Sequence, residues 1–138
     1  MLYSLHNIKK ELTEGRNPVK ISRVYGSNTV NRYMLLEDVS FYLSNGLIIN
    51  IKKGYIWDLS SSPRFLWSLF PPDGDFQIAA LIHDFLYENK ITSRKFADKE
   101  MFLWSMVISG TDHFSFRNMD NRLRFHTVRL FGWYIYNK

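Results

Sequence analysis

The segment from residue 75 to residue 98 reads DFQIAALIHDFLYENKITSRKFAD and places ionisable side chains inside an apolar run. Its periodicity predicts a helix over about residues 75–89, and a helix that is apolar on all sides is a buried helix. A buried ionisable group costs free energy unless it is paired or coordinated. The imidazole of His83 therefore needs partners, and Asp84 and Asp98 are carboxylates in the same segment that can supply them.

A second helix is predicted over residues 94–108, after a short connection capped by Thr92 or Ser93. Two helices joined by so few residues are expected to be antiparallel neighbours, which brings Asp98 opposite His83. A histidine that is oriented by an aspartate is a common general base for water. We therefore predict His83 as the base, with Asp98 and Tyr87 as its supporting residues.

Two further carboxylates suit a hard cation. Asp84 lies next to the histidine, and Asp58 lies in a loop flanked by glycine and serine. Calcium and similar divalent cations prefer oxygen ligands, so both residues are predicted as metal ligands. A structural network is the alternative, in which His83 and Asp98 lock the two helices together, Tyr87 donates to Asp84, and Asp58 caps a helix.

The remaining pattern predicts one α+β domain over residues 1–138, with a small antiparallel β-sheet or hairpin followed by a bundle of three to four helices. Asn45-Gly46, between two β-rich runs, is a hairpin signal because both residues tolerate positive φ. Residues 55–57 are expected to lead into a loop. The other predicted elements are a helix over 4–14, strands over 19–26, 32–43 and 47–51, a short helix over 64–70 and a last helix over 115–136.

Composition and charge limit the class of protein. The chain is 46% hydrophobic and 17% aromatic, which excludes a disordered protein, and it has no cysteine for a disulfide or thiolate zinc site. No apolar run is long enough to span a membrane, and charges interrupt the N-terminal segment where a signal peptide would be apolar.

The net charge of +5 is concentrated at the two ends of the chain. Residues 113–138 carry five basic residues and one acidic residue, and a basic amphipathic helix is predicted over residues 114–136. Such a helix can dock on an anionic membrane or an acidic protein, and nucleic acid is the less favoured partner. Alternatively, it closes the core of the domain. The predicted partner-binding residues are Arg122, Arg124 and Arg129.

A motif pattern runs from about residue 33 to residue 110. It consists of a hairpin, Gly-aromatic-x-x-Asp-Leu-x-Ser-x-Pro-Arg, Pro-Pro-x-Gly, Ala-Ala-x-x-His-Asp-x-Leu-Tyr and Ser-Arg-x-x-Ala-Asp. This pattern resembles a family of small proteins of unknown function that are encoded mainly by tailed bacteriophages and prophages. One departure is Trp57, where that family usually has a small hydroxyl residue. The matching residues are Gly54, Tyr55, Asp58, Leu59, Ser61, Pro63, Arg64, Pro71, Pro72, Gly74, Ala79, Ala80, His83, Asp84, Leu86, Tyr87, Ser93, Arg94, Ala97 and Asp98.

The His-Asp-x-x-Tyr motif with Ala-Asp on the next helix is also similar to phospholipases A2, especially those of parvovirus capsid proteins. That resemblance implies His83 as the base for water, Asp84 as a calcium ligand, and Tyr87 and Asp98 as supports. The glycine-rich calcium loop of those enzymes is missing, since no Gly-x-Gly precedes the helix.

The sequence therefore predicts a bacteriophage protein with a His/Asp hydrolase-like site, assisted by calcium or another divalent cation. The alternative is a non-catalytic tail or neck protein with a structural His/Asp cluster. The expected partners are phage virion proteins or an anionic membrane, and the expected location is the virion or the host cytoplasm. The oligomeric state is left open.

Overall fold

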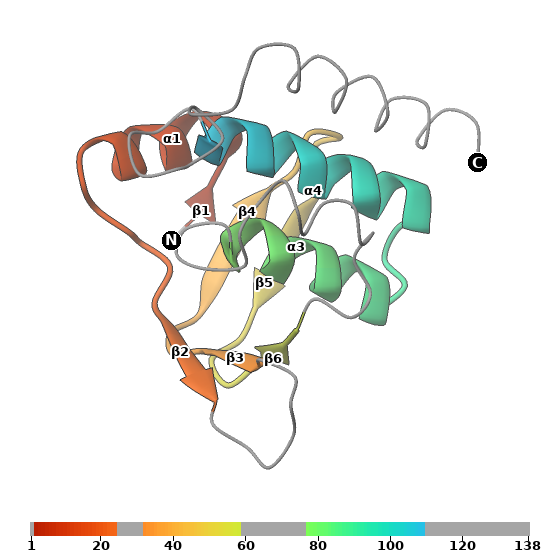
Figure 1. The fold of residues 1–138 in the computed structure, drawn as a ribbon. Helices are drawn as coiled ribbons and strands as arrows, with labels where there is room; N and C mark the ends of the chain where they lie inside the picture. Colours follow the sequence, from red (N-terminus) through yellow and green to blue (C-terminus); the bar gives the residue numbers. More distant parts are fainter. Residues whose placement is uncertain (1, 25–31, 59–76, 110–138) are drawn as a thin grey trace, which may run out of the picture.

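The computed structural model describes residues 2–24, 32–58 and 77–109. Figure 1 shows short strands on one side of the chain and helices α3 and α4 packed across them. No helix within these ranges is long and apolar enough to cross a membrane. In chain order the elements are β1 (Leu2–Tyr3), α1 (Leu5–Thr13), β2 (Ile21–Val24), β3 (Arg32–Leu35), β4 (Val39–Tyr42), β5 (Ile48–Ile51), β6 (Ile56–Trp57), α3 (Gln77–Glu88) and α4 (Arg94–Ser109).

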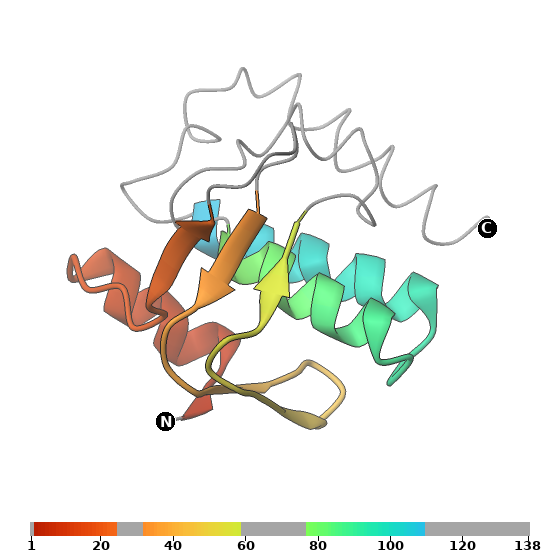
Figure 2. The same cartoon turned by 90° about the horizontal axis from the view of Figure 1, so that it is seen from below.

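The described strands form two small sheets. One has the order β1-β4-β5, with β1 parallel to β4 and β4 antiparallel to β5. The other has the order β2-β3-β6 and is antiparallel throughout; its strands lie side by side in Figure 2. The predicted hairpin about Asn45-Gly46 is present between β4 and β5, and Gly46 has the positive φ of 88° that the turn requires.

One prediction about strands is wrong, and one strand was not predicted. The predicted strand over residues 32–43 is broken into β3 and β4, which belong to different sheets. The Asp38 carboxylate accepts the Lys53 backbone N–H at 2.7 Å and helps to hold the turn between the two strands. Residues 56 and 57 form a strand that was not predicted, because Gly54 turns the chain with φ of 93° and β6 then pairs with β3; the loop expected after residue 57 lies mostly outside the described residues.

The predicted α+β class is confirmed. The helix expected over residues 4–14 is α1, and the Ser4 side chain caps it by accepting the backbone N–H of Asn7. The helices expected over 75–89 and 94–108 are α3 and α4. The helices predicted over 64–70 and 115–136 lie outside the described residues.

Helix α3 lies in the core, as its apolar sequence predicts. Its residues from Gln77 to Asp84 are all buried, and α4 packs alongside it (Figures 1 and 2). The side chains of α3, of the inner sheet faces and of α1 form one hydrophobic cluster. His83, Asp84 and Asp98 are therefore carried by two helices that pack against each other.

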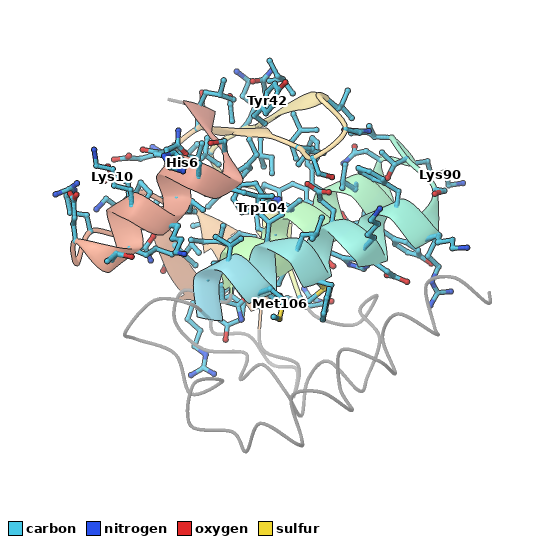
Figure 3. All side chains as sticks on the ribbon, turned by 90° about the horizontal axis from the view of Figure 1, so that it is seen from above. His6, Lys10, Tyr42, Lys90, Trp104 and Met106 are labelled. Carbon is cyan, nitrogen blue, oxygen red and sulfur yellow. The ribbon has the colours of Figure 1, made fainter. Side chains whose placement is uncertain are left out.

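A buried carboxylate fastens α4 to the β4–β5 hairpin. Glu100 is fully buried and accepts hydrogen bonds from the backbone N–H and the hydroxyl of Ser44, at 2.9 and 2.5 Å. It also accepts the indole N–H of Trp104 at 3.1 Å, and the Trp104 ring meets Phe41 of β4 edge to face. Trp104 lies between α4 and the hairpin in Figure 3. This contact fixes the position of α4, and with it the position of Asp98.

Candidate functional site

A buried histidine–aspartate pair joins α3 to α4. The Nε2 atom of His83 lies 2.7 Å from the Oδ1 atom of Asp98, and the two side chains are 0% and 1% exposed. The contact predicted from the short connection between the helices is therefore present. Because a carboxylate can only accept, the neutral imidazole carries its proton on Nε2. That tautomer leaves the Nδ1 atom of His83 as a basic lone pair.

The second nitrogen of this histidine has no hydrogen-bond partner. Among the described residues, Nδ1 of His83 is the one buried side-chain nitrogen or oxygen without a hydrogen bond. The nearest carboxylate oxygen is Oδ1 of Asp84 at 3.8 Å, which is too long for a hydrogen bond. The other carboxylate oxygen of Asp84 accepts the backbone N–H of Asp58 at 3.1 Å. The end of β6 therefore holds the Asp84 carboxylate beside the imidazole without closing the gap.

The charges of the two aspartates set the basicity of the imidazole. Burial lowers the pKa of His83, but the neighbouring Asp84 and Asp98 carboxylates favour the imidazolium and outweigh burial, so that the pKa is raised above its ordinary value of 6.5. A raised pKa means that His83 holds a proton more tightly than a free imidazole. It can act as a base once it has lost that proton.

Tyr87, the second predicted support of the histidine, contacts it through ring faces. The two rings are nearly parallel, with an interplanar angle of 8° and centroids 6.1 Å apart. Tyr87 is 40% exposed, whereas His83 is fully buried. The guanidinium of Arg94 lies over the same ring, 5.8 Å from its centroid.

Two polar contacts beside the site were missed by sequence reasoning. The Tyr55 hydroxyl donates to Glu88 at 2.7 Å, and burial, this bond and the nearby Asp84 and Asp58 charges raise the pKa of Tyr55 well above its usual range. The indole N–H of Trp57 donates to Gln77 at 3.1 Å. Trp57 lies in β6 and Tyr55 directly precedes it, and no motif in the sequence predicts this strand.

The predicted metal ligands, Asp84 and Asp58, are neighbours in the structure through the backbone of Asp58. Within the described ranges, however, no three His, Asp or Glu side chains converge as a metal site. Calcium usually takes six to eight oxygen ligands, so these two residues do not form a calcium site by themselves. The predicted partner-binding residues lie outside the described residues; they are Arg122, Arg124 and Arg129.

The comparison with protein families identifies the group to which this chain is related. Residues 33–119 match the model of a family described as "Protein of unknown function (DUF1353)". No curated protein and no solved structure matches the chain. The family match begins at β3 and includes β6, α3 and α4, which carry His83, Asp84 and Asp98. Because the match covers more than half of the sequence, the chain belongs to the DUF1353 family of proteins of unknown function.

Proposed function

We propose that the protein is a hydrolase in which His83, oriented by Asp98, is the general base that activates a water molecule. The observation that carries this proposal is the Nδ1 atom of His83, which is buried and has no hydrogen-bond partner among the described residues. A histidine with a purely structural role would normally satisfy both nitrogens, because a buried polar atom left without a partner costs about 1–3 kcal/mol.

The chemistry follows from the tautomer that Asp98 imposes. The neutral imidazole donates from Nε2 to Asp98 and accepts at Nδ1. Water that attacks an ester carbonyl would transfer a proton to Nδ1, and the same proton would later pass to the leaving alkoxide. The Asp98 and Asp84 carboxylates stabilise the imidazolium that forms between these steps.

The substrate class comes from the resemblance of the His-Asp-x-x-Tyr and Ala-Asp motifs to phospholipases A2. We propose a carboxylic ester of a phospholipid. The test is fatty-acid release from vesicles of phosphatidylglycerol by the purified protein. His83→Gln should lower the rate by about 10²-fold or more. His6→Gln is the matched control, because His6 is exposed on α1 (Figure 3) and lies outside the site.

The pH profile gives a second measurement. Since the imidazole must be neutral to accept a proton, the rate should rise with pH through the raised pKa of His83. Asp98→Asn removes a charge that favours the imidazolium, so the inflection should move to lower pH. Undetectable ester hydrolysis by the wild type on phosphatidylglycerol and phosphatidylcholine vesicles would reject the proposal.

A non-catalytic role in a phage particle is the second candidate. The burial of the cluster favours it, because His83, Asp84 and Asp98 are 0%, 2% and 1% exposed. In this role the pair only joins α3 to α4. The phage or prophage origin, the virion or host-cytoplasm location, and the virion or anionic-membrane partner are proposals that rest on the sequence resemblance and the basic C-terminal segment. Mass spectrometry of purified phage particles tests for the virion location.

Cation binding also stays a proposal, because Asp84 and Asp58 need further ligands. If a cation binds there, calcium should raise the melting temperature of the wild type and leave that of Asp84→Asn unchanged. No step of the proposed reaction depends on this cation. Calorimetric titrations without heat for calcium, magnesium and zinc would discard the cation and leave the proposal about His83 standing.

A further inference from the structure

A second candidate site lies at the start of α3, away from the His83–Asp98 pair. A pocket of about 390 Å³ opens between β2, β3 and the first residue of α3. Pockets of this volume are typical of small-molecule sites. Gln77 at the pocket and His83 are six residues apart, which is about 9 Å along a helix. The pocket is therefore separate from the proposed catalytic base. The described residues that line it include Val19, Lys20, Ile21, Arg23, Tyr33 and Gln77.

The inner wall of the pocket is built from buried side chains that are held in place. Val19, Tyr33 and Gln77 are 3%, 7% and 2% exposed. The Tyr33 ring packs against the Trp57 ring with centroids 6.1 Å apart, and the Trp57 indole donates to Gln77. These contacts fix one apolar and aromatic wall before any ligand arrives, and a pre-formed wall lowers the cost of binding.

The outer part of the pocket is positively charged. Lys20 and Arg23 are exposed, and within the described part of the chain neither has a carboxylate at ion-pair distance. None of the described residues that line the pocket is acidic. By contrast, Arg16 is paired with both Glu11 and Glu14. Among the described residues, therefore, no carboxylate neutralises the two cations that the pocket presents.

We propose that this pocket binds the phosphate group of a small organic phosphate. A phosphate monoester carries about −1.5 to −2 charges at pH 7, which matches the two cations, and arginine binds phosphate through paired N–H donors. Val19, Ile21 and Tyr33 then contact the organic part of the ligand. The phosphate belongs either to a soluble metabolite or to the headgroup of a lipid, and the two sources give different results in the test.

The experiment is isothermal titration of the full chain with phenyl phosphate, and separately with inorganic phosphate. Sedimentation with phosphatidylcholine vesicles that contain phosphatidic acid tests the lipid source. The test variant is Lys20→Gln/Arg23→Gln. The matched control is Lys9→Gln/Lys10→Gln, which removes the same charge from exposed positions on α1. Circular dichroism and the melting temperature check that both variants are folded.

We expect saturable binding of one phenyl phosphate per chain, with an affinity at least about tenfold lower in the test variant and unchanged in the control, since each lost contact to a charged group is worth about tenfold or more. Binding of phenyl phosphate without vesicle binding assigns the pocket to a soluble phosphate. Vesicle binding that the test variant loses and the control keeps assigns it to a lipid headgroup.

Absence of saturable binding to all three probes, or equal losses in the test variant and the control, would overturn the proposal. If the test variant does not fold, Arg23→Lys, which keeps the charge but removes the paired donors, should still weaken phenyl phosphate binding, and unchanged binding would overturn the proposal.

Discussion

Truncation of Asp98 tests the central contact of the candidate site. Asp98→Ala removes the partner of the Nε2 atom, which lies 2.7 Å away, and leaves His83 at 0% exposure with neither nitrogen bonded. Breaking a buried ion pair at one partner costs about 3–5 kcal/mol. For a domain of this size, that loss corresponds to a fall in the melting temperature of roughly 10–20 °C. Asp98→Asn keeps an acceptor oxygen and should cost only about 1–2 kcal/mol.

The pH dependence of this effect separates charge from packing. The folded protein raises the pKa of His83 above 6.5, so it binds a proton that the unfolded chain releases near that pH. The stabilisation from the charged pair is therefore complete below about pH 6.5, and it is lost as the pH rises through the folded-state pKa. The difference in unfolding free energy between the wild type and Asp98→Asn should be larger at pH 5.5 than at pH 8.5.

Urea unfolding followed by tryptophan fluorescence measures these differences, and an NMR titration of the imidazole reports the pKa of His83 directly. Lys99→Ala is the control on the same helix, because Lys99 is exposed and its loss should change the unfolding free energy by less than about 0.5 kcal/mol. A cost below about 1 kcal/mol for Asp98→Ala would refute the buried-pair reasoning. If the difference in unfolding free energy between the wild type and Asp98→Asn does not vary with pH, the inference that His83 is charged in this pair is refuted.

Three other outcomes follow from the described contacts and the sequence. Glu100→Ala should cost about 3 kcal/mol in urea unfolding, because the Ser44 and Trp104 donors lose their acceptor, and a similar loss in Glu100→Gln would contradict this reason. Tyr55→Phe should lower the unfolding free energy by about 1 kcal/mol, because the hydrogen bond to Glu88 is lost. The raised pKa of the Tyr55 phenol predicts that the wild type loses stability above about pH 10, and the variant should lose less; the same loss in both proteins would contradict the raised pKa. Reversal of the three C-terminal arginines to glutamate should preserve folding and abolish salt-sensitive binding to anionic liposomes, whereas loss of soluble protein would favour the core-closing role.

The parts of the site that could be predicted from the sequence are those fixed by local geometry. The helical period determines which side chains share a face of α3. The short connection before α4 makes the two helices antiparallel neighbours, which places Asp98 opposite His83. The apolar run explained the burial of α3, and Asn45-Gly46 identified the β4–β5 hairpin. Each of these inferences spans fewer than about twenty residues, over which helix and turn preferences are strong.

The parts that could not be predicted depend on pairing between distant segments. The break between β3 and β4 and the strand β6 are set by which strands pair, and β6 is too short to show an alternating pattern. The contact of the Asp58 backbone with Asp84 depends on β6, so it was missed as well. Glu100 reads as an ordinary helix-surface residue, and only the approach of the hairpin makes it a buried acceptor.

The two functions proposed for the chain make opposite demands on the Nδ1 atom of His83. A structural cluster is most stable when Asp84 closes on this atom, yet the two groups are 3.8 Å apart, about 1 Å beyond hydrogen-bond length. The other oxygen of the Asp84 carboxylate accepts the backbone N–H of Asp58 at 3.1 Å. Native proteins leave few buried polar atoms unsatisfied, and those that remain are often associated with catalysis or with a bound water. The gap between His83 and Asp84 is therefore a physical reason to test hydrolysis before accepting a purely structural role.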